Sequence, residues 1–338
     1  MSGSAARKSG WLLAAAAILP IILLVVSLNI GAYHIPLKAV WTTLVNALSP
    51  GRAAAASPYA DILFRIRLPR LLLAMFAGAA LAVSGASLQA IFKNPLVFEF
   101  SLGISFGAAF GAALSLVFLG RGFPPQLSAF AFAILAVVLV LVIAGKSASQ
   151  IVPVLLSGII ISALFQAFLS LVEFFANPYA LQALVFWLMG SLAQAVWEDL
   201  ALTLPVIGLG VIVLILLRWR MNVLSLGEEE ARALGINVKA ERFLVIAVAT
   251  LVAAAVTSVT GVINWIGLIV PHLVRMMVGA DNKKVIPLSA GLGASLLIVA
   301  DDIARSAASF EIPIGILTSV VGLPLFIILL KKSGKIWQ

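Results

Sequence analysis

The stretch PRLLLAMFAGAALAVSGASLQAI, residues 69–91, decides the class of fold. It is an apolar run as long as a bilayer is thick, since a membrane-crossing helix needs roughly 20 residues. Gly78 and Gly85, with alanines between them, lie seven residues apart and share one face of such a helix. Lipid gives helices no hydrophobic reason to associate, so small residues that let two backbones approach closely must supply the packing. The stretch therefore predicts a membrane helix packed inside a helical bundle.

Similar apolar runs occur on both sides of this stretch, along all 338 residues. The hydrophobic fraction is 63% and only 10% of residues are charged, against about a quarter in soluble domains. The run that follows Arg7 and Lys8 is too long for a signal peptide, so we expect it to be kept as the first span. The sequence predicts an all-α, polytopic membrane protein with ten spans, at approximately 11–31, 69–91, 98–119, 126–145, 151–174, 195–218, 241–259, 262–280, 286–305 and 314–331.

The positions of lysine and arginine predict the orientation of the chain. With the N-terminus inside, most of the 22 basic residues fall in cytoplasmic segments, as the positive-inside rule requires. An even number of spans then leaves both termini in the cytoplasm. The formal charge of +9 comes from these short loops, so it does not indicate nucleic-acid binding. Arg65, Arg67 and Arg70 cluster on the outside against the rule, which indicates a partner for their charge.

A second set of small residues occurs in the third predicted span. Gly103, Gly107 and Gly111 recur every four residues, which places them on one face of a helix. We interpret them as a helix-packing surface, because close backbone approach is what holds membrane helices together.

The longest inside loop, residues 218–242, carries the signals of a short helix. Ser225 can cap its start with Glu228 three residues on, and Gly235 can end it. Three successive glutamates from Glu228 suit the positive N-terminal end of a helix. We expect a compact, exposed helix that docks a cytoplasmic partner; a solvated amphipathic linker is the alternative.

The chain offers no residues for enzyme chemistry or for a metal site. It has no cysteine, and its two histidines lie in distant segments, so no cluster of either type can hold a metal. Gly145, Lys146 and Ser147 resemble the end of a phosphate-binding loop, but Val140 stands where that motif needs glycine. No nucleophile with a neighbouring base is recognisable. The sequence therefore predicts neither ATP binding nor catalysis by this chain.

Few charged residues fall inside the predicted spans. Glu99, Glu173, Asp301 and Asp302 all lie near span ends. Ionisable groups at membrane depth commonly mark a proton or ion pathway. These positions favour local salt bridges or snorkelling instead, and they leave no acid in mid-membrane for a proton relay.

Five segments together resemble the FecCD family of permeases, the type II importers for iron–siderophores, haem, vitamin B12 and, in some branches, molybdate. They are IRLPRLLLAMFAGAALAVSGASLQAIFKNPL (66–96), LGISFGAAFG (102–111), LGEEEARALGINV (226–238), GLIVPHLVR (267–275) and ADDIARSAASFEIPIGILTSVVGLPLFIILL (300–330). They occur in the family's order and the similarity covers nearly the whole chain. One departure is NPLVFEF, which has Phe98 and Glu99 where the family often has an acid and a proline.

The resemblance implies a single permease domain over residues 1–338, in the cytoplasmic (inner) membrane. It implies a homodimer, two cytoplasmic ATPase subunits that bind the ATP and magnesium, and an extracytoplasmic substrate-binding protein. It implies no cofactor on the chain itself.

The resemblance also implies roles for individual residues. Arginines at the outer face would pair with acids of the binding protein, and these are Arg67, Arg70 and Arg305. The cytoplasmic gate would lie before the fifth span, at Ser149, Gln150, Ile151 and Val152. The helix that couples the permease to the ATPase would comprise Leu226, Gly227, Glu228, Glu229, Glu230, Ala231, Arg232, Ala233, Leu234, Gly235, Ile236 and Asn237.

The predicted function is that of a permease subunit that imports a metal chelate, with an iron complex expected. Vitamin B12, haem and an oxyanion such as molybdate remain open. A secondary transporter driven by an ion gradient is the alternative class, and it would need mid-membrane acids and discontinuous helices. A membrane-embedded enzyme would need a catalytic cluster, which the sequence does not display.

Overall fold

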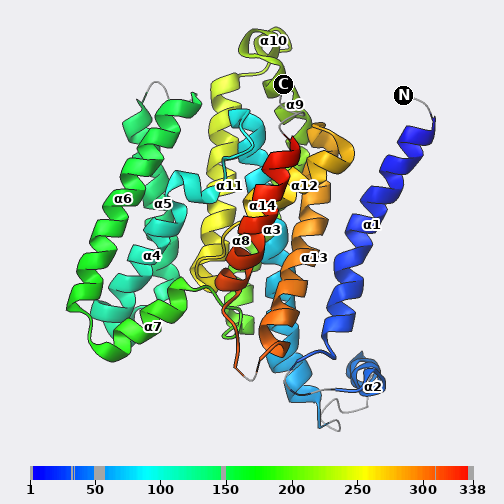
Figure 1. Cartoon of the computed structure of the whole chain (residues 1–338), viewed down its shortest axis with the longest axis vertical. Coiled ribbons are helices and arrows are strands. Elements are labelled where there is room, and N and C mark those ends of the chain that lie inside the picture. Colours follow the sequence, from blue (N-terminus) through cyan, green and yellow to red (C-terminus); the bar gives the residue numbers. More distant parts are fainter. Residues whose placement is uncertain are drawn as a thin grey trace.

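The computed structural model describes residues 3–31, 33, 35–48, 58–145, 150–308 and 310–333 (Figure 1). Within these ranges the regular structure is entirely helical, which confirms the predicted all-α fold. The α-helices are α1 (Gly3–Ser27), α2 (Leu37–Leu48), α3 (Leu68–Phe92), α4 (Ile104–Leu114), α5 (Pro125–Ala144), α6 (Ile151–Phe175), α7 (Pro178–Leu188), α8 (Trp197–Leu216), α9 (Arg218–Leu226), α10 (Glu228–Ala233), α11 (Val238–Thr260), α12 (Ile266–Val278), α13 (Asn282–Ser306) and α14 (Ile314–Ser333).

Each of the ten predicted spans corresponds to a helix in the described part of the chain. Seven helices are long and apolar enough to cross a membrane. The other three spans correspond to the shorter apolar helices Ile104–Leu119, Ile266–Val278 and Ile314–Leu329. The short one at 266 begins inside the predicted span 262–280, because residues 261–265 are not helical and Trp265 has a φ of +75°. The amphipathic α2 and the 11-residue α7 were not predicted as helices.

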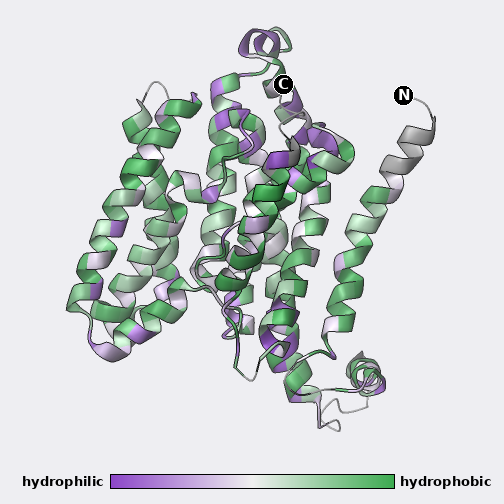
Figure 2. Cartoon of the chain, viewed as in Figure 1, coloured by the Kyte–Doolittle hydropathy of each residue, from purple (hydrophilic) through white to green (hydrophobic). Residues whose placement is uncertain are grey.

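The polar residues gather at the two ends of the bundle. Figure 2 shows hydrophobic ribbon through the middle and hydrophilic ribbon around α10 and at the far end of α13. The start of α1 and the end of α14 lie at the same end as α10, and α2 and α7 lie at the opposite end (Figure 1). This distribution is that of a bundle that crosses a bilayer.

Helix α3 forms the centre of the bundle, and most of its residues are buried. It packs against α8, α11, α12 and α13. Its two glycines allow the closest approaches: a Cβ at Gly78 would overlap the carbonyl of Gly293 on α13, and one at Gly85 would overlap the carbonyl of Gly267 on α12. The predicted role of Gly78 and Gly85 as a packing face is therefore confirmed.

A second group of helices consists of α4, α5 and α6, which lie together at one side of the bundle (Figure 1). Gly107 and Gly111 of α4 lie directly against the backbone of α5, at Phe132 and Ser128. Gly103 differs, because it precedes α4 with a φ of +76° and faces α6 at Ile161. The three glycines therefore do not share one helix face: two of them pack the helix and the first one shapes its start.

Replacing Gly85 by alanine tests the close contact of α3. The added Cβ would overlap the Gly267 carbonyl, and overpacking of this kind costs about 1–3 kcal/mol. We expect a lower unfolding temperature of the purified chain in detergent. Gly208→Ala is the matched control, because Gly208 lies within α8 and has open space beside it. That change should be neutral or stabilising by up to about 1 kcal/mol; equal melting of both variants would show that the contact is unimportant.

Candidate functional site

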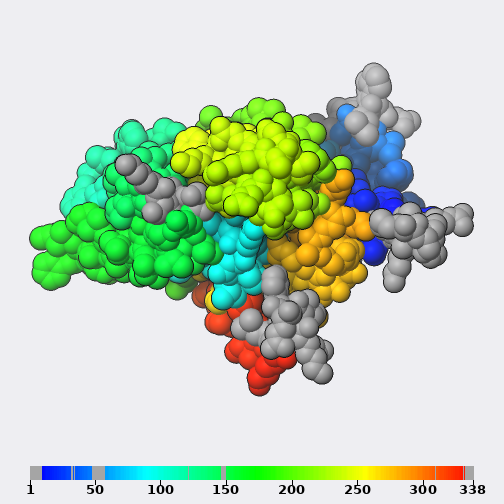
Figure 3. Space-filling model, turned by 90° about the horizontal axis from the view of Figure 1, so that it is seen from above, coloured from blue at the N-terminus to red at the C-terminus, as the bar shows by residue number. Residues whose placement is uncertain are grey.

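Polar residues gather in a region at each end of the bundle and in one group inside it. The first region is the projecting segment formed by α9 and α10. Figure 3 views the molecule from this end and shows the yellow-green residues around α10 in the middle of the surface. The sequence predicted one helix capped by Ser225, and that detail is wrong. Ser225 lies within α9, where its Oγ donates to the Asn222 carbonyl at 2.7 Å. Gly227 separates α9 from α10, so the segment is two short helices joined at a glycine.

The end of α10 is built as the glycine signal predicted. Gly235 has a φ of +78°, in the region that favours glycine. Its N–H donates to the Arg232 carbonyl at 2.9 Å, and the N–H of Ile236 donates to the Ala231 carbonyl at 3.0 Å. These two bonds form a Schellman motif, which satisfies carbonyls that a helix end leaves free. Ala231 is fully buried while Leu234 is 57% exposed, so α10 is anchored on one side and presented on the other.

Ion pairs fasten this segment to the bundle. Arg242 of α11 donates to Glu228 at 2.7 Å, and Arg232 lies 3.3 Å from the same carboxylate. The hydrogen bond from Arg242, and then its positive charge, lower the pKa of the Glu228 carboxyl. From α9, the Asn222 side chain donates to Asp281 at 2.7 Å, just before α13. Short polar contacts therefore connect α10 to α11 and α9 to the start of α13.

The predicted gate residues lie at the start of α6. Gln150 is exposed and precedes the helix, and Val152 is exposed in its first turn. Ile151 is half-buried. Ser149 lies outside the described residues. The gate role of these residues stays a prediction.

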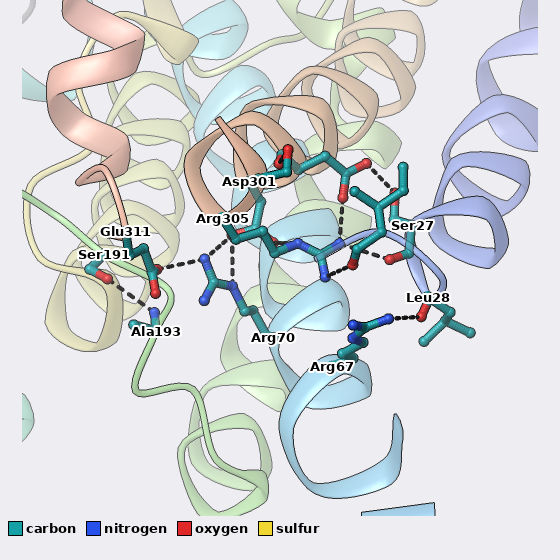
Figure 4. Close-up of polar contacts among 12 residues, drawn as sticks. Ser27, Leu28, Arg67, Arg70, Ser191, Ala193, Asp301, Arg305 and Glu311 are labelled. Carbon is teal, nitrogen blue, oxygen red and sulfur yellow. Dashed lines mark hydrogen bonds and ion pairs between the residues drawn. The ribbon is translucent and has the colours of Figure 1, made fainter. Parts of the chain in front are cut away.

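The second polar region lies at the opposite end of the bundle and contains Arg67, Arg70 and Arg305 (Figure 4). Arg70 donates from Nε to Asp301 at 2.8 Å and from Nη2 to Glu311 at 2.6 Å. Asp301 is fully buried. These contacts join the start of α3 to the end of α13 and to the segment that leads into α14.

The other two arginines tie α1 into the same region. Arg305 pairs with Asp302, and its guanidinium donates to the carbonyls of Ile30 at 2.6 Å and Ser27 at 2.8 Å. Arg67 donates to the carbonyl of Leu28 at 2.5 Å and also to that of Tyr33. Both guanidiniums therefore bind the carbonyls at the C-terminal end of α1 through charge-assisted hydrogen bonds, which are stronger than neutral ones.

These contacts change the interpretation of the three clustered arginines. The sequence placed the partners of Arg67, Arg70 and Arg305 on a binding protein, but the structure supplies partners within the chain. Arg67 is only 5% exposed and Arg70 only 7%. Three arginines meet three acids, so the formal charges balance. The salt bridges expected for Asp301 and Asp302 are confirmed. The same expectation is wrong for Glu99, which is buried without an ion-pair partner among the described residues. The docking role stays a prediction, and it would require an exchange of carboxylate partners.

Glu311 is the member of this cluster that the sequence did not point to. It lies in the segment between α13 and α14, and its side chain is 33% exposed. The signal for it was available, since Glu311 is the one acid in the stretch SAASFEIPIG (306–315). Its partner could not be read from that stretch, because Arg70 lies 241 residues away.

A third group of polar residues lies inside the bundle. Arg275 of α12 donates to the Gln89 side chain, and Gln89 donates to the Gly267 carbonyl at 3.2 Å. Glu99 is buried beside Gly267, and neither of its carboxylate oxygens has a hydrogen-bond partner among the described residues. No group of three metal-ligating side chains occurs in the described ranges. These residues join α12 to α3 and give no catalytic geometry.

Several known proteins are similar to this chain in sequence or in fold. The FecCD transport family matches residues 18–332. The molybdate import system permease protein MolB of Haemophilus influenzae is 38% identical over 325 residues, covering 94% of this chain and 95% of that protein. An iron chelatin transport system permease protein of Helicobacter pylori is 39% identical over 272 residues, covering 80% of this chain and 83% of its own.

One solved structure is similar to this fold over almost the whole length of the chain. It is described as an inward-facing conformation of a metal-chelate type ABC transporter. Its TM-score with this chain is 0.84 at 37% sequence identity, and the match covers 96% of this chain and 99% of the other. The expected fold class is confirmed by this similarity.

The pair between Glu228 and Arg242 gives a test of how firmly α10 is held. Glu228→Gln removes the charge that Arg242 contacts, and a partly exposed pair contributes about 0.2–1 kcal/mol. We expect hydrogen exchange of the amides in 228–236 to become up to about five-fold faster. Because the folded-state pKa of Glu228 is lowered, its contribution is present at neutral pH and is lost as the pH falls through that lowered pKa.

Glu229→Gln is the control for this change, because Glu229 is a neighbouring, exposed glutamate of α10. Its exchange rates should stay at the level of the unaltered chain. If both variants exchange alike, the contact with Arg242 does not hold α10 in place.

Proposed function

The chain belongs to the FecCD transport family, and from this premise we propose that it carries an iron chelate across the cytoplasmic membrane. The chain is the permease subunit of an ATP-binding-cassette importer and a multi-pass membrane protein, and it is not itself an enzyme. The match over residues 18–332 is the observation on which the proposal depends. Haem, vitamin B12 and molybdate are the alternative substrates.

Two observations favour a chelate. The Helicobacter pylori relative is named for iron chelatin transport, and the similar solved structure is described as a metal-chelate type transporter. A bare transition metal would need several ligating side chains, whereas an intact chelate brings its own ligands. The described residues contain no group of three such side chains, and this suits a permease that moves the complex as a whole.

The two polar ends suggest where the partners bind. The end with α10 would lie in the cytoplasm with both termini, and α10 would contact an ATPase subunit. The opposite end would receive the substrate-binding protein. Two permease chains and two ATPases would form the complete importer. The support for this arrangement is the exposed, firmly anchored α10 at one end and the charged cluster at the other.

Uptake by the complete importer tests the substrate. The permease is reconstituted in liposomes with its ATPase and binding protein, and uptake of a radiolabelled ferric hydroxamate is compared with that of molybdate. We expect ATP-dependent accumulation of the ferric complex, unaffected by an uncoupler, since ATP and not an ion gradient supplies the energy. Accumulation of molybdate but not of the iron complex would overturn the proposed substrate.

The binding of the substrate-binding protein tests the role of Arg70. If an acid of that protein takes over Arg70, it must compete with Glu311, which Arg70 contacts at 2.6 Å. Glu311→Gln should therefore raise the affinity of docking by up to about five-fold, while Asp301 still holds Arg70 in place.

Arg65→Gln is the control for docking. Arg65 is the exposed arginine of the same region, with 80% of its side chain accessible. Loss of docking in Arg65→Gln, together with no change in Glu311→Gln, would move the docking role from the buried arginines to the exposed one.

A further inference from the structure

A partly open cavity of about 660 Å³ lies at the end of the bundle opposite α10. Its walls come from the starts of α5 and α8, from α7, from the end of α11 and from the segment before α14. Its volume falls within the roughly 300–1,000 Å³ that is usual for small-molecule sites. Glu311 of this wall contacts Arg70, as Figure 4 shows. The cavity therefore adjoins the arginine cluster.

The wall of the cavity combines acids, amides and an aromatic ring. Asp199 and Glu311 supply carboxylates, Gln126 and Gln194 supply amides, and Trp187, beside Phe186, supplies an aromatic ring. None of the described side chains that line it is lysine, arginine or histidine. The carboxylate of Glu311 forms an ion pair with Arg70. Asp199 has no ion-pair partner in the described part of the chain, so it gives the cavity its negative character.

We propose that this cavity is an outward-facing binding site for a neutral or cationic chelate that carries hydroxyl, amide or amine donors. Carboxylates and amide oxygens accept hydrogen bonds from such donors, and the Trp187 ring can contact the apolar or cationic parts. An oxyanion would meet the carboxylate of Asp199 and no cation among the described lining residues, so the site favours a neutral or cationic ligand over an oxyanion. The inference rests on the proposed function and names the substrate class that enters the importer.

The position of Asp199 has a simpler explanation that must be separated from this one. Acids are favourable in the first turn of a helix because of the helix dipole, and both Glu198 and Asp199 lie in the first turn of α8. Only Asp199 lines the cavity, whereas Glu198 is exposed outside it. Glu198→Gln therefore removes the same charge from the same helix end and leaves the wall of the cavity intact.

Equilibrium binding to the full chain in lipid nanodiscs tests the site. The probes are radiolabelled ferrioxamine B, a cationic ferric trihydroxamate, and the molybdate dianion. In Asp199→Asn the affinity for ferrioxamine B should fall about five-fold, the effect of one unit charge at close range in water, and the loss should shrink at high salt. Glu198→Gln should leave the affinity unchanged. Gln194→Glu, which adds an acid to the wall, should raise it.

The outcomes separate this inference from the proposed function. Equal binding by Asp199→Asn and Glu198→Gln, or binding of molybdate in preference to ferrioxamine B, would overturn the cavity as the site. ATP-dependent uptake by the complete importer is measured separately. If uptake of the ferric complex persists while the nanodisc binding is insensitive to Asp199, the importer function stands and the site is wrong.

Discussion

Direct backbone contact between α3 and its neighbours is the constraint on which the rest of the structure depends. Gly78 lies against Gly293, and Gly85 lies against Gly267, with no room for a Cβ at either position of α3. In lipid, the hydrophobic effect does not bring helices together, so such contacts must supply the association. They place α12 and α13 at fixed depths along α3. The polar residues at both ends of these helices are positioned as a result.

The same helices connect the two polar ends of the bundle. Helix α3 has 25 residues and spans about 38 Å. At its N-terminal end Arg70 binds Asp301 of α13, and near its C-terminal end Gln89 binds Arg275 of α12. The α9 and α10 segment reaches this group through Asn222 and Asp281. Polar contacts therefore connect the α9 and α10 segment to α13, the helix that also carries Asp301 and Arg305 at its other end.

Sequence patterns were sufficient where the cause is local. The apolar runs specify the spans because the bilayer sets their length, and Gly235 specifies the end of α10 because few other residues adopt a positive φ at low cost. Patterns were misleading where two local explanations compete. Serine is a residue type that commonly caps helices, yet Ser225 lies inside α9. Gly103 continues a four-residue repeat, yet it precedes α4 and shapes its start instead of packing its face.

The parts that no local pattern contains are the long-range pairings. Nothing near Arg70 indicates that its partners are Asp301 and Glu311, more than 200 residues away. The excess of outer arginines was recognised, but their burial depends on how α1, α3 and α13 meet. The cavity has the same origin, since Asp199, Trp187 and Glu311 come together only when α7, α8 and the segment before α14 are packed.

The central claim is that this chain has no energy source of its own and receives force at α10. The chain contains no cysteine, so a single introduced thiol can be cross-linked without interference. Leu234→Cys, on the exposed side of α10, is predicted to form a covalent adduct with the ATPase in the assembled importer, whereas Tyr179→Cys on α7 is predicted to form none. An adduct from Tyr179→Cys alone, or labelling of Leu234→Cys by a membrane-impermeant reagent added outside intact cells, would contradict the account.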